Sequence, residues 1–304
     1  MTEHHHEAKA EIPTGFRWPG GRSVAVVLSI AYEVWSEGHV SGVGPMGNPL
    51  PPGIFDTNAD SYGRYGARTG IRRLLRLIGH TGAPVDVFTS GALAERDPAQ
   101  VKAIAAEGHG IVAHGYTQDA IPAKLTPDED AENIRITTAR LADITGNQPS
   151  GWISPRASPG RSTRALLARA GYRWHADDLD ADLPYVERYS GHPLVSIPLG
   201  VELNDLAHGM RHGRTPRQFI EMFEDAVTNC LSDPDNPVVI DVLVHAHCYG
   251  RPASAWAFAE IARMSLAHDD LWLTTREQIS NLVLAGEADA ASGSSSRVRA
   301  SFGP

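Results

Sequence analysis

Two histidines stand two residues apart after a buried apolar run near the end of the chain, in the stretch VLVHAHCYGRP. His245 and His247 would share one face of an extended strand end, because side chains alternate along a strand. One imidazole of such a pair could donate a proton while the other binds substrate or metal. A single histidine at a strand end is more often structural, but a spaced pair after a buried strand favours a functional site.

Polar side chains follow most of the other apolar runs in the same way. The groups that come directly after these runs, besides the two histidines, are Glu33, His114, Arg156, Asp177, Asp178, Glu202, Asn204 and Asp205. If the strands are parallel, all these side chains project from the carboxyl ends of the strands, the rim that carries the active site in (β/α) barrels. The sequence therefore predicts an enzyme.

Apolar runs of strand character alternate with amphipathic stretches along most of the chain. We expect strands at Val24–Ile30, Val85–Thr89, Gly110–Ala113, Gly151–Ser154, Trp174–Ala176, Leu194–Pro198, Val238–Val244 and Leu271–Thr274. We expect helices at Arg68–Gly79, Pro98–Glu107, Pro127–Thr145, Arg161–Ala170, Pro216–Leu231, Ala253–Ala267 and Glu277–Leu284. This alternation predicts a parallel sheet covered by helices. The fold class is therefore α/β, an irregular (β/α) barrel of seven to eight parallel strands.

Composition sets further limits. The chain has 304 residues, of which 42% are apolar, and this is ample for a sizeable core. A formal net charge of −9 argues against nucleic acid as a partner, and no apolar run reaches the roughly 18 residues of a membrane span. The polar N-terminus lacks the apolar core of a signal peptide, so we expect a cytoplasmic protein. Its two cysteines, Cys230 and Cys248, are expected to be buried thiols.

The same considerations predict the domain organisation and the partners. We expect a polar N-terminal arm at 1–17, a single barrel domain at 18–284 and a disordered tail at 285–304. The expected partner is a small-molecule substrate, with no nucleic acid and no membrane, and we expect a homo-oligomer. The run His4-His5-His6 is excluded from the site.

Two motifs after the middle strands carry open alternatives. GIVAHGYTQD places His114 after a buried strand with Gln118 four residues later, a weak metal pair because an amide oxygen is a poor zinc ligand. In GWISPRASPG, Arg156 could grip a carboxylate or orient a catalytic acid. It could also form a structural ion pair with Asp177 or Asp178.

Acidic and amide groups follow the later strands. The aspartates of WHADDLDADLPY lack the glycine turn and terminal glutamate of a calcium loop, so most are expected to be caps or loop ion pairs. Asp182 is kept as a candidate substrate contact. Glu202, Asn204 and Asp205 in VELNDLAHG could hydrogen-bond a polar substrate such as a ureide or an imide.

The order of these motifs resembles the polysaccharide-deacetylase superfamily, from about Trp18 to Leu284. The most specific pieces are ADLPY at Ala181–Tyr185, ELND at Glu202–Asp205 and HAHCYGRP at His245–Pro252. The pattern is most similar to the branch that contains the metal-independent allantoinase and the cyclic imide hydrolases. The resemblance implies an irregular (β/α) barrel and hydrolysis of a carbon–nitrogen amide bond.

The resemblance also assigns positions. Typical deacetylases of the superfamily have two aspartates after the first strand, a base and then a metal ligand, and here these positions hold Glu33 and Val34. Their second motif begins and ends with a histidine, and here it begins with His114 and ends with Gln118. Their Leu-x-His motif, whose histidine is the general acid, matches at His245. Two of the three metal ligands are therefore replaced.

Amide hydrolysis needs an activated water, a stabilised oxyanion and a proton for the leaving nitrogen. Our hypothesis is that Glu33 activates water, His114 and His247 hold the oxyanion, and His245 protonates the leaving nitrogen. Arg156 would orient the acid or grip the substrate. We predict no cofactor, but a divalent metal such as zinc, held by His114, His247 and Glu33, stays an alternative.

Two other functions also stay open: a metal-dependent N-deacetylase of acetylated amino sugars, and a catalytically inactive barrel that binds a metabolite. The segment 41–70, rich in glycine and proline, separates the first strand from the first helix. Long loops of this kind are usually lids or interfaces, so we expect it to cover the site or to join two subunits. Tyr65 within it is a candidate substrate contact.

Overall fold

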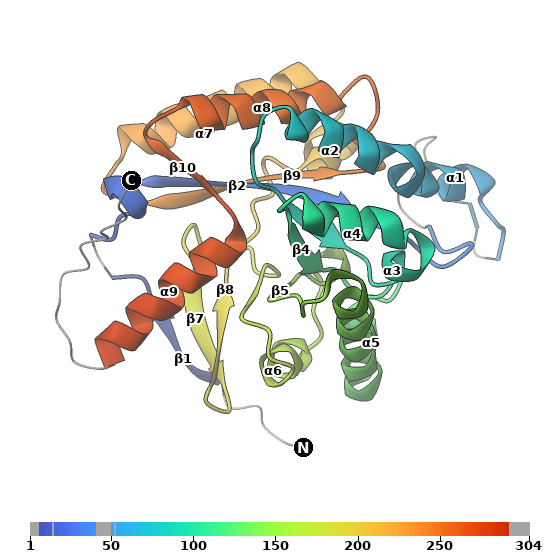
Figure 1. Cartoon of the computed structure of the whole chain (residues 1–304), viewed down its shortest axis with the longest axis horizontal. Coiled ribbons are helices and arrows are strands. Elements are labelled where there is room, and N and C mark those ends of the chain that lie inside the picture. The colour runs from blue at the N-terminus through green and yellow to red at the C-terminus, as the bar shows by residue number, and fades with distance from the viewer. Residues whose placement is uncertain (1–5, 14, 41–49, 52, 292–304) are drawn as a thin grey trace.

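A curled, mostly parallel sheet forms a half-barrel whose outer face is covered by helices (Figure 1). The computed structural model describes residues 6–13, 15–40, 50–51 and 53–291. This is the α/β architecture that the alternation of strands and helices predicts.

The sheet of the described residues has ten strands. They are β1 (His6–Glu11), β2 (Val24–Tyr32), β3 (Asp86–Thr89), β4 (Gly110–Ala113), β5 (Gly151–Trp152), β6 (Trp174–His175), β7 (Tyr185–Tyr189), β8 (His192–Ser196), β9 (Val238–His245) and β10 (Leu271–Thr274). The eight predicted strands are all present, with small shifts at their ends.

Strand β2 pairs with three other strands near one end of the sheet, and the strands β2 to β6 and β8 to β10 all run parallel. Strand β9 pairs with β2 along Val24–Ala31, β10 along Val24–Val27, and β3 along Ser29–Tyr32. From β3 the order continues through β4, β5, β6 and β8. A single parallel bridge between Asn204 and Leu243 connects the segment after β8 back to β9.

The two strands that the sequence did not predict lie at the far edge. Strand β7 forms an antiparallel hairpin with β8 through Ser190 and Gly191, whose φ angles of 51° and 80° are left-handed. Strand β1 pairs antiparallel with β7, so the polar N-terminal arm contributes an edge strand. The sequence YVERY of β7 has two consecutive charged residues and no alternating pattern, so the strand is recognised only from its pairing with β1 and β8.

The helices lie between the strands, as predicted, with two additions. They are α1 (Thr57–Tyr65), α2 (Ile71–Gly79), α3 (Leu93–Arg96), α4 (Pro98–Ala106), α5 (Pro127–Thr145), α6 (Thr163–Arg169), α7 (Pro216–Ser232), α8 (Ala255–Ala267) and α9 (Arg276–Ala291). Thr126 and Thr215 form capping boxes directly before α5 and α7, and both helices begin at the predicted residue. Helices α1 and α3 were not predicted.

Two segments differ from the sequence-based expectation. Within 41–70, α1 and a π-helix at Gly66–Gly70 lead directly into α2, so this part is helical; residues 41–49 and 52 lie outside the described residues. The Asp56 carboxylate begins α1 by accepting hydrogen bonds from the first free N–H groups. The tail predicted as disordered from residue 285 is still helical to Ala291, and 292–304 lie outside the described residues.

Both faces of β2 are buried, in two different cores. The even-numbered residues from Val24 to Tyr32 pack with the helices that cover the outer face. Ala25, Val27 and Ala31 pack inside the half-barrel, where α9 contributes Ile279. Because side chains alternate along a strand, the numbering predicts which face any residue near the strand end will occupy.

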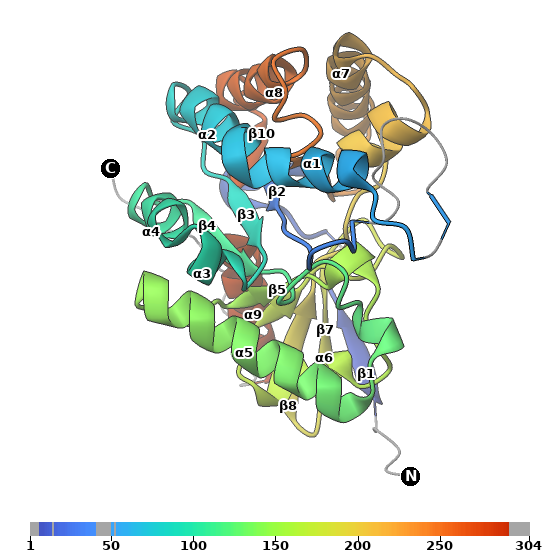
Figure 2. The same cartoon turned by 90° about the vertical axis from the view of Figure 1, so that its right-hand side faces the viewer.

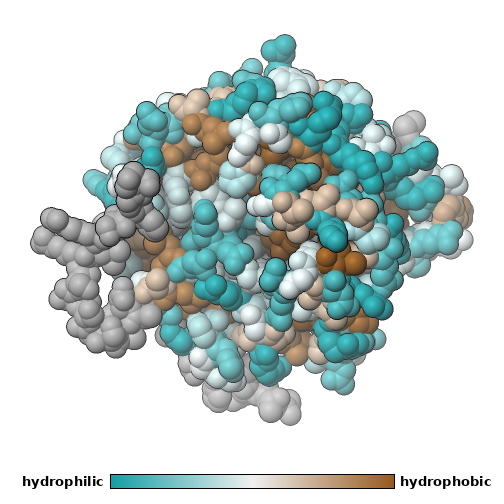
Figure 3. Space-filling view, in the orientation of Figure 1, coloured by the Kyte–Doolittle hydropathy of each residue, from teal (hydrophilic) through white to brown (hydrophobic). Residues whose placement is uncertain are grey.

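The surface is mixed. On the face seen in Figure 3, hydrophilic side chains surround separate hydrophobic areas. Among the described residues, no helix is both long enough and apolar enough to span a membrane.

Candidate active site

Glu33 lies inside the half-barrel at the carboxyl end of β2. It continues the odd-numbered series of inner residues and is only 7% exposed. His114 Nε2 lies 3.2 Å from its Oε1, and His247 Nδ1 lies 3.4 Å from its Oε2. Oε2 has no hydrogen-bond partner among the described residues. A buried carboxylate with one unused oxygen is well placed to bind and deprotonate a water molecule.

His114 is held from the neighbouring strands. Val112 of β4 lies two residues before His114 and packs in the inner core. His114 comes just after the strand and therefore faces the same side of the sheet. Its Nδ1 donates to the carbonyl oxygen of Ile153 at 2.9 Å, and this contact directs Nε2 toward Glu33. The ring is therefore fixed at both nitrogens.

His245 ends β9 and is oriented by Asp205. The Asp205 carboxylate accepts a hydrogen bond from His245 Nδ1 at 2.6 Å and another from the His245 backbone N–H at 2.8 Å. It also accepts from the Tyr249 backbone N–H at 3.1 Å. Both oxygens of Asp205 are thus engaged, so this residue, expected as a substrate contact, instead positions His245 with Nε2 toward the site.

His247 lies between aromatic rings. Trp35 and Tyr62 contact it edge to face, with ring centroids 5.4 Å and 5.7 Å away, and His245 is at 5.5 Å. Its Nε2 has no hydrogen-bond partner among the described residues. Together with Glu33 Oε2, this atom is a buried polar group that a substrate could satisfy.

The pKa values of Glu33, His245 and His247 are shifted in different directions. Burial opposes ionisation of Glu33, but the charge of His245 and the hydrogen bond from His114 outweigh it and lower its pKa to about 2. Burial opposes the charge on His245 as well, yet Asp205 and Glu33 raise its pKa. Burial lowers the pKa of His247 to about 4. At neutral pH the site therefore holds the Glu33 carboxylate and the neutral imidazole of His247, beside the His245 imidazole, whose pKa is raised.

The segment from α1 to α2 packs against the histidine turn that follows β9. In Figure 2, α1 and α2 follow one another above strand β2. Gly66 and Gly70 in the π-helix allow this: a Cβ on Gly66 would lie 2.9 Å from the backbone nitrogen of His247, and one on Gly70 would collide with the carbonyl oxygen of Ala246. Tyr62 of α1 reaches His247 from the same side. The part of the predicted lid that the structure describes thus forms a wall of the site.

Arg156 lies beside the cluster in a strained turn. Its φ of 61° and that of Ala157, 46°, are left-handed without glycine. The turn packs on Gly115, the residue after His114, where a Cβ would lie 2.7 Å from Pro155. The Arg156 side chain is exposed and forms no ion pair with the described residues.

The structural pairing considered for Arg156 is made by other residues. Asp178 pairs with Arg164 of α6. Asp177 accepts hydrogen bonds from the backbone N–H and the hydroxyl of Ser154, at 2.6 Å and 2.7 Å. Asp177 therefore ties the end of β5 to the end of β6, and Arg156 is left available at the rim.

Of the other predicted substrate contacts, Asp182, Glu202 and Asn204 do not join the cluster. The Asp182 carbonyl accepts from Val239 at the start of β9, the end of the strand opposite to His245. Glu202 is exposed, and Asn204 accepts from the backbone N–H of Leu206 at 3.0 Å. Tyr65 is half-buried near the site.

Zinc at the position used by metal-dependent deacetylases does not fit these residues. Val34 carries no donor atom and packs in the core under the helices, on the opposite side from Glu33. The Gln118 amide nitrogen donates to Ser90 Oγ at 3.0 Å and to the His114 carbonyl at 2.8 Å, so it is committed within the protein. The backbone N–H of Gln118 donates to the carbonyl oxygen of Val34 at 2.9 Å. The two positions that hold metal ligands in the metal-dependent deacetylases are therefore neighbours in space here, as the resemblance implies.

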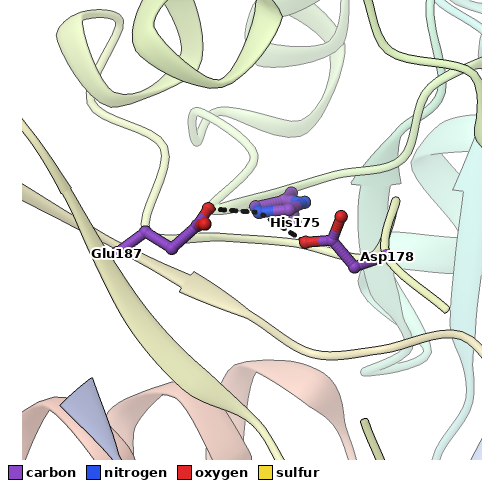
Figure 4. A group of neighbouring side chains, drawn as sticks. All are labelled: His175, Asp178 and Glu187. Atoms are coloured by element: carbon purple, nitrogen blue, oxygen red, sulfur yellow. Dashed lines mark ion pairs between the residues drawn. The ribbon is translucent and has the colours of Figure 1, made fainter. Parts of the chain in front are cut away.

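A second possible ligand group lies elsewhere. Within the described residues, the ligand atoms of His175, Asp178 and Glu187 lie within 4.8 Å of one another (Figure 4). Arg164 already supplies a positive charge to both carboxylates. His175 Nδ1 accepts from the Asp177 backbone N–H at 3.3 Å, so the ring proton of the neutral form is on Nε2, the atom facing the carboxylates. A neutral ring in this state offers no lone pair to a metal there.

Comparisons with known proteins show what the chain is similar to. Residues 55–175 match the polysaccharide deacetylase family. This part of the chain, less than half of its length, is similar to a polysaccharide deacetylase domain. This confirms the predicted resemblance to that superfamily and supports the predicted enzyme class, an amide-bond hydrolase.

Two solved structures are similar to this chain over most of its length. PuuE allantoinase is 26% identical, with a TM-score of 0.79 over 88% of this chain and 92% of that one. A probable polysaccharide deacetylase from Pseudomonas aeruginosa PAO1 is 26% identical, with a TM-score of 0.77 over 87% and 92%. Among curated protein sequences, a peptidoglycan deacetylase of Helicobacter pylori is 29% identical over 54% of this chain and 55% of its own.

Some residues of the site were not singled out in the sequence. Trp35 and the Arg251 side chain both lie at the site, and neither was assigned a role. Arg251 belongs to the HAHCYGRP motif, so its position directly after the two histidines was an available signal. Trp35 is two residues after Glu33, and the same face of the strand end would have suggested it.

Proposed function

We propose that this protein hydrolyses the carbon–nitrogen bond of a small cyclic amide, imide or ureide. The observation that carries the proposal is the buried arrangement of Glu33 between His114 and His247, with the Asp205-bound His245 beside it. This arrangement provides a base, an oxyanion donor and an acid without a metal ligand at position 34.

Glu33 is the base in this mechanism. Its Oε2 takes a proton from a water molecule as the water oxygen bonds to the substrate carbonyl carbon. Its low pKa keeps it ionised in the resting enzyme, and transfer becomes favourable only as the water attacks. His114 and His247 lie on either side of Glu33. The unpartnered Nε2 of His247 would donate a hydrogen bond to the oxygen that becomes negative, and His114 would hold the Glu33 carboxylate beside it.

His245 is the acid. Asp205 raises its pKa and fixes Nδ1 as a donor, so the proton on Nε2 is available to the leaving nitrogen when the carbon–nitrogen bond breaks. Arg156, exposed at the rim, would grip the substrate. A ring-opened product would retain the protonated nitrogen and the new carboxyl group.

The enclosure of the site favours a small substrate. The exposed fractions of Glu33, His114, His245 and His247 are 7%, 4%, 6% and 1%. A polymer would need an open groove to reach these atoms, whereas a single ring can be enclosed. A metal-dependent N-deacetylase of acetylated amino sugars is the alternative, and its support is the similarity to the peptidoglycan deacetylase of Helicobacter pylori.

The test compares substrates and variants in parallel. Hydantoin, succinimide and allantoin are assayed against N-acetylglucosamine oligomers, before and after exhaustive chelation. We expect turnover of at least one cyclic amide that survives chelation, and a fall in kcat of about 10²- to 10⁴-fold in Glu33→Gln. Glu37→Gln, an exposed glutamate four residues later, is the matched control.

Two results would overturn the proposal. One is full activity of Glu33→Gln on a cyclic amide. The other is deacetylation of the oligomers, lost on chelation and restored by zinc, with no turnover of any cyclic amide.

A further inference from the structure

The side chain of Arg251 lies at the edge of the proposed active site. Arg251 Nε donates to the backbone carbonyl of His247 at 3.2 Å. Its guanidinium carbon is 4.4 Å from the ring centroid of Tyr62 and 4.1 Å from that of Tyr65. Tyr62 in turn contacts the His247 ring. The guanidinium therefore lies within the same group of side chains as the catalytic imidazole.

Among the residues that the structure describes, this guanidinium has no anionic partner. Arg251 forms no ion pair with the described residues, and the internal residues outside that part, 41–49 and 52, contain no Asp or Glu. It is half-buried, so its charge is partly removed from water. An arginine in such a place normally has a carboxylate beside it, because burying an unpaired charge is costly.

The two tyrosines leave one part of the guanidinium open. Rings packed against its flat faces stabilise the cation without using its hydrogen-bond donors. The single hydrogen bond that it makes in the described structure uses Nε, so Nη1 and Nη2 stay available. A pair of N–H groups in one plane is the arrangement that binds a carboxylate through both oxygens.

The surroundings hold this arrangement rigid. Arg73 of α2 donates to the Tyr65 hydroxyl at 2.6 Å and to the carbonyl of Gly250, the residue before Arg251, also at 2.6 Å. One side chain therefore fixes both the ring and the backbone that carry the guanidinium. A binding group held by supporting contacts loses little entropy when a ligand binds.

We propose that Arg251, with Tyr62 and Tyr65, forms a subsite for a carboxylate on the substrate. The inference rests on the proposed function and narrows it: the cyclic amide carries an acidic substituent beside its reacting ring. The carboxylate would pair with Nη1 and Nη2 while the ring lies toward His247 and Glu33. Specificity then comes from pairing a charge that the free enzyme leaves unpaired.

The experiment compares two substrates that differ in one group, hydantoin and hydantoin-5-acetic acid. In the wild-type enzyme we expect kcat/KM to favour the acid by about 10- to 100-fold, mainly through KM, as for a charge-assisted hydrogen-bonded pair. In Arg251→Met this preference should disappear, and in Arg251→Lys it should be partly kept. Arg217→Met is the matched control, because Arg217 lies 5.8 Å from the Trp256 ring centroid in another cation–π contact. Its preference should equal that of the wild type.

A binding measurement separates failure of this inference from failure of the proposed function. Calorimetry on Glu33→Gln gives the affinity for each compound without turnover. Tighter binding of the acid that Arg251→Met abolishes in the same background supports the subsite even if neither compound is hydrolysed. Equal affinity of Glu33→Gln for the two compounds, or an acid preference that survives in Arg251→Met, would overturn it.

Discussion

Glu33 and Val34 are neighbours in the chain but face opposite sides of the sheet. Glu33 points into the half-barrel toward His114 and His247, and Val34 packs in the outer core under the helices. The alternation of the strand end imposes this separation. A metal ligand at position 34 would therefore need a change of backbone as well as of side chain. The backbone after β2, and not only the side chain of Val34, therefore differs from what a metal ligand at this position would need.

The contact between Asp205 and His245 leads to a first prediction. Asp205→Asn removes the charge that raises the pKa of His245 while keeping a similar shape. We expect kcat to fall by about 10²-fold or more, as for loss of an oriented general acid. The proposed mechanism uses the protonated form of His245, so a lower pKa of His245 should move the alkaline limb of the kcat profile to lower pH.

The pH profile distinguishes this role from a purely structural one. An exposed aspartate of α7, Asp225, provides the control, and Asp225→Asn should leave both kcat and the profile unchanged. A lower kcat in Asp205→Asn with the alkaline limb at its original pH would contradict the assignment of His245 as the acid oriented by Asp205.

Burial of His247 leads to a second prediction, on stability. Its pKa is about 4 in the folded protein and about 6.5 when the chain unfolds, so the unfolded chain binds the proton more tightly. The stabilisation is full above pH 6.5 and is lost as the pH falls toward 4. This shift corresponds to a change of up to about 3 kcal/mol in the free energy of unfolding.

Urea unfolding of His247→Gln between pH 4 and 7 measures that contribution. We expect a flatter dependence of the free energy of unfolding on pH than in the wild type, since the group that binds the proton is gone. His39→Gln, at an exposed histidine, should keep the wild-type slope. An unchanged slope in His247→Gln would show that other groups cause the acid sensitivity.

The sequence predicted the central strands well because their residues are apolar on both faces. Every residue of β2 is buried, and such a run is recognisable without knowledge of the fold. Strand β7 carries charged residues that are buried only through tertiary contacts, as Glu187 is, so no local pattern identifies it. Helix α1 was missed for a related reason: its sequence TNADSYGRY has weak helix formers, and its contacts with the site help to hold it.

The members of the site could be predicted more easily than their partners. Glu33, His114, His245 and His247 all follow buried strands, and parallel strands bring their carboxyl ends to one rim. The pairing of Asp205 with His245 joins residues 40 positions apart through a loop, which no spacing rule predicts. The same holds for Arg164, which takes the aspartate that Arg156 was considered to pair with.

The close approach of the π-helix to the histidine turn leads to a third prediction. At Gly70 there is no room for a methyl group, because it would collide with the Ala246 carbonyl, so Gly70→Ala must push the two segments apart. We expect a loss of about 1–3 kcal/mol in the free energy of unfolding, as for other overpacked sites, and a marked loss of activity through displacement of His247. Gly79→Ala, at the end of α2 where a Cβ meets no atom within 4 Å, should be neutral or slightly stabilising. Thermal unfolding and kcat of the two variants check this, and equal behaviour of Gly70→Ala and Gly79→Ala would mean that the π-helix does not need its close contact with the turn.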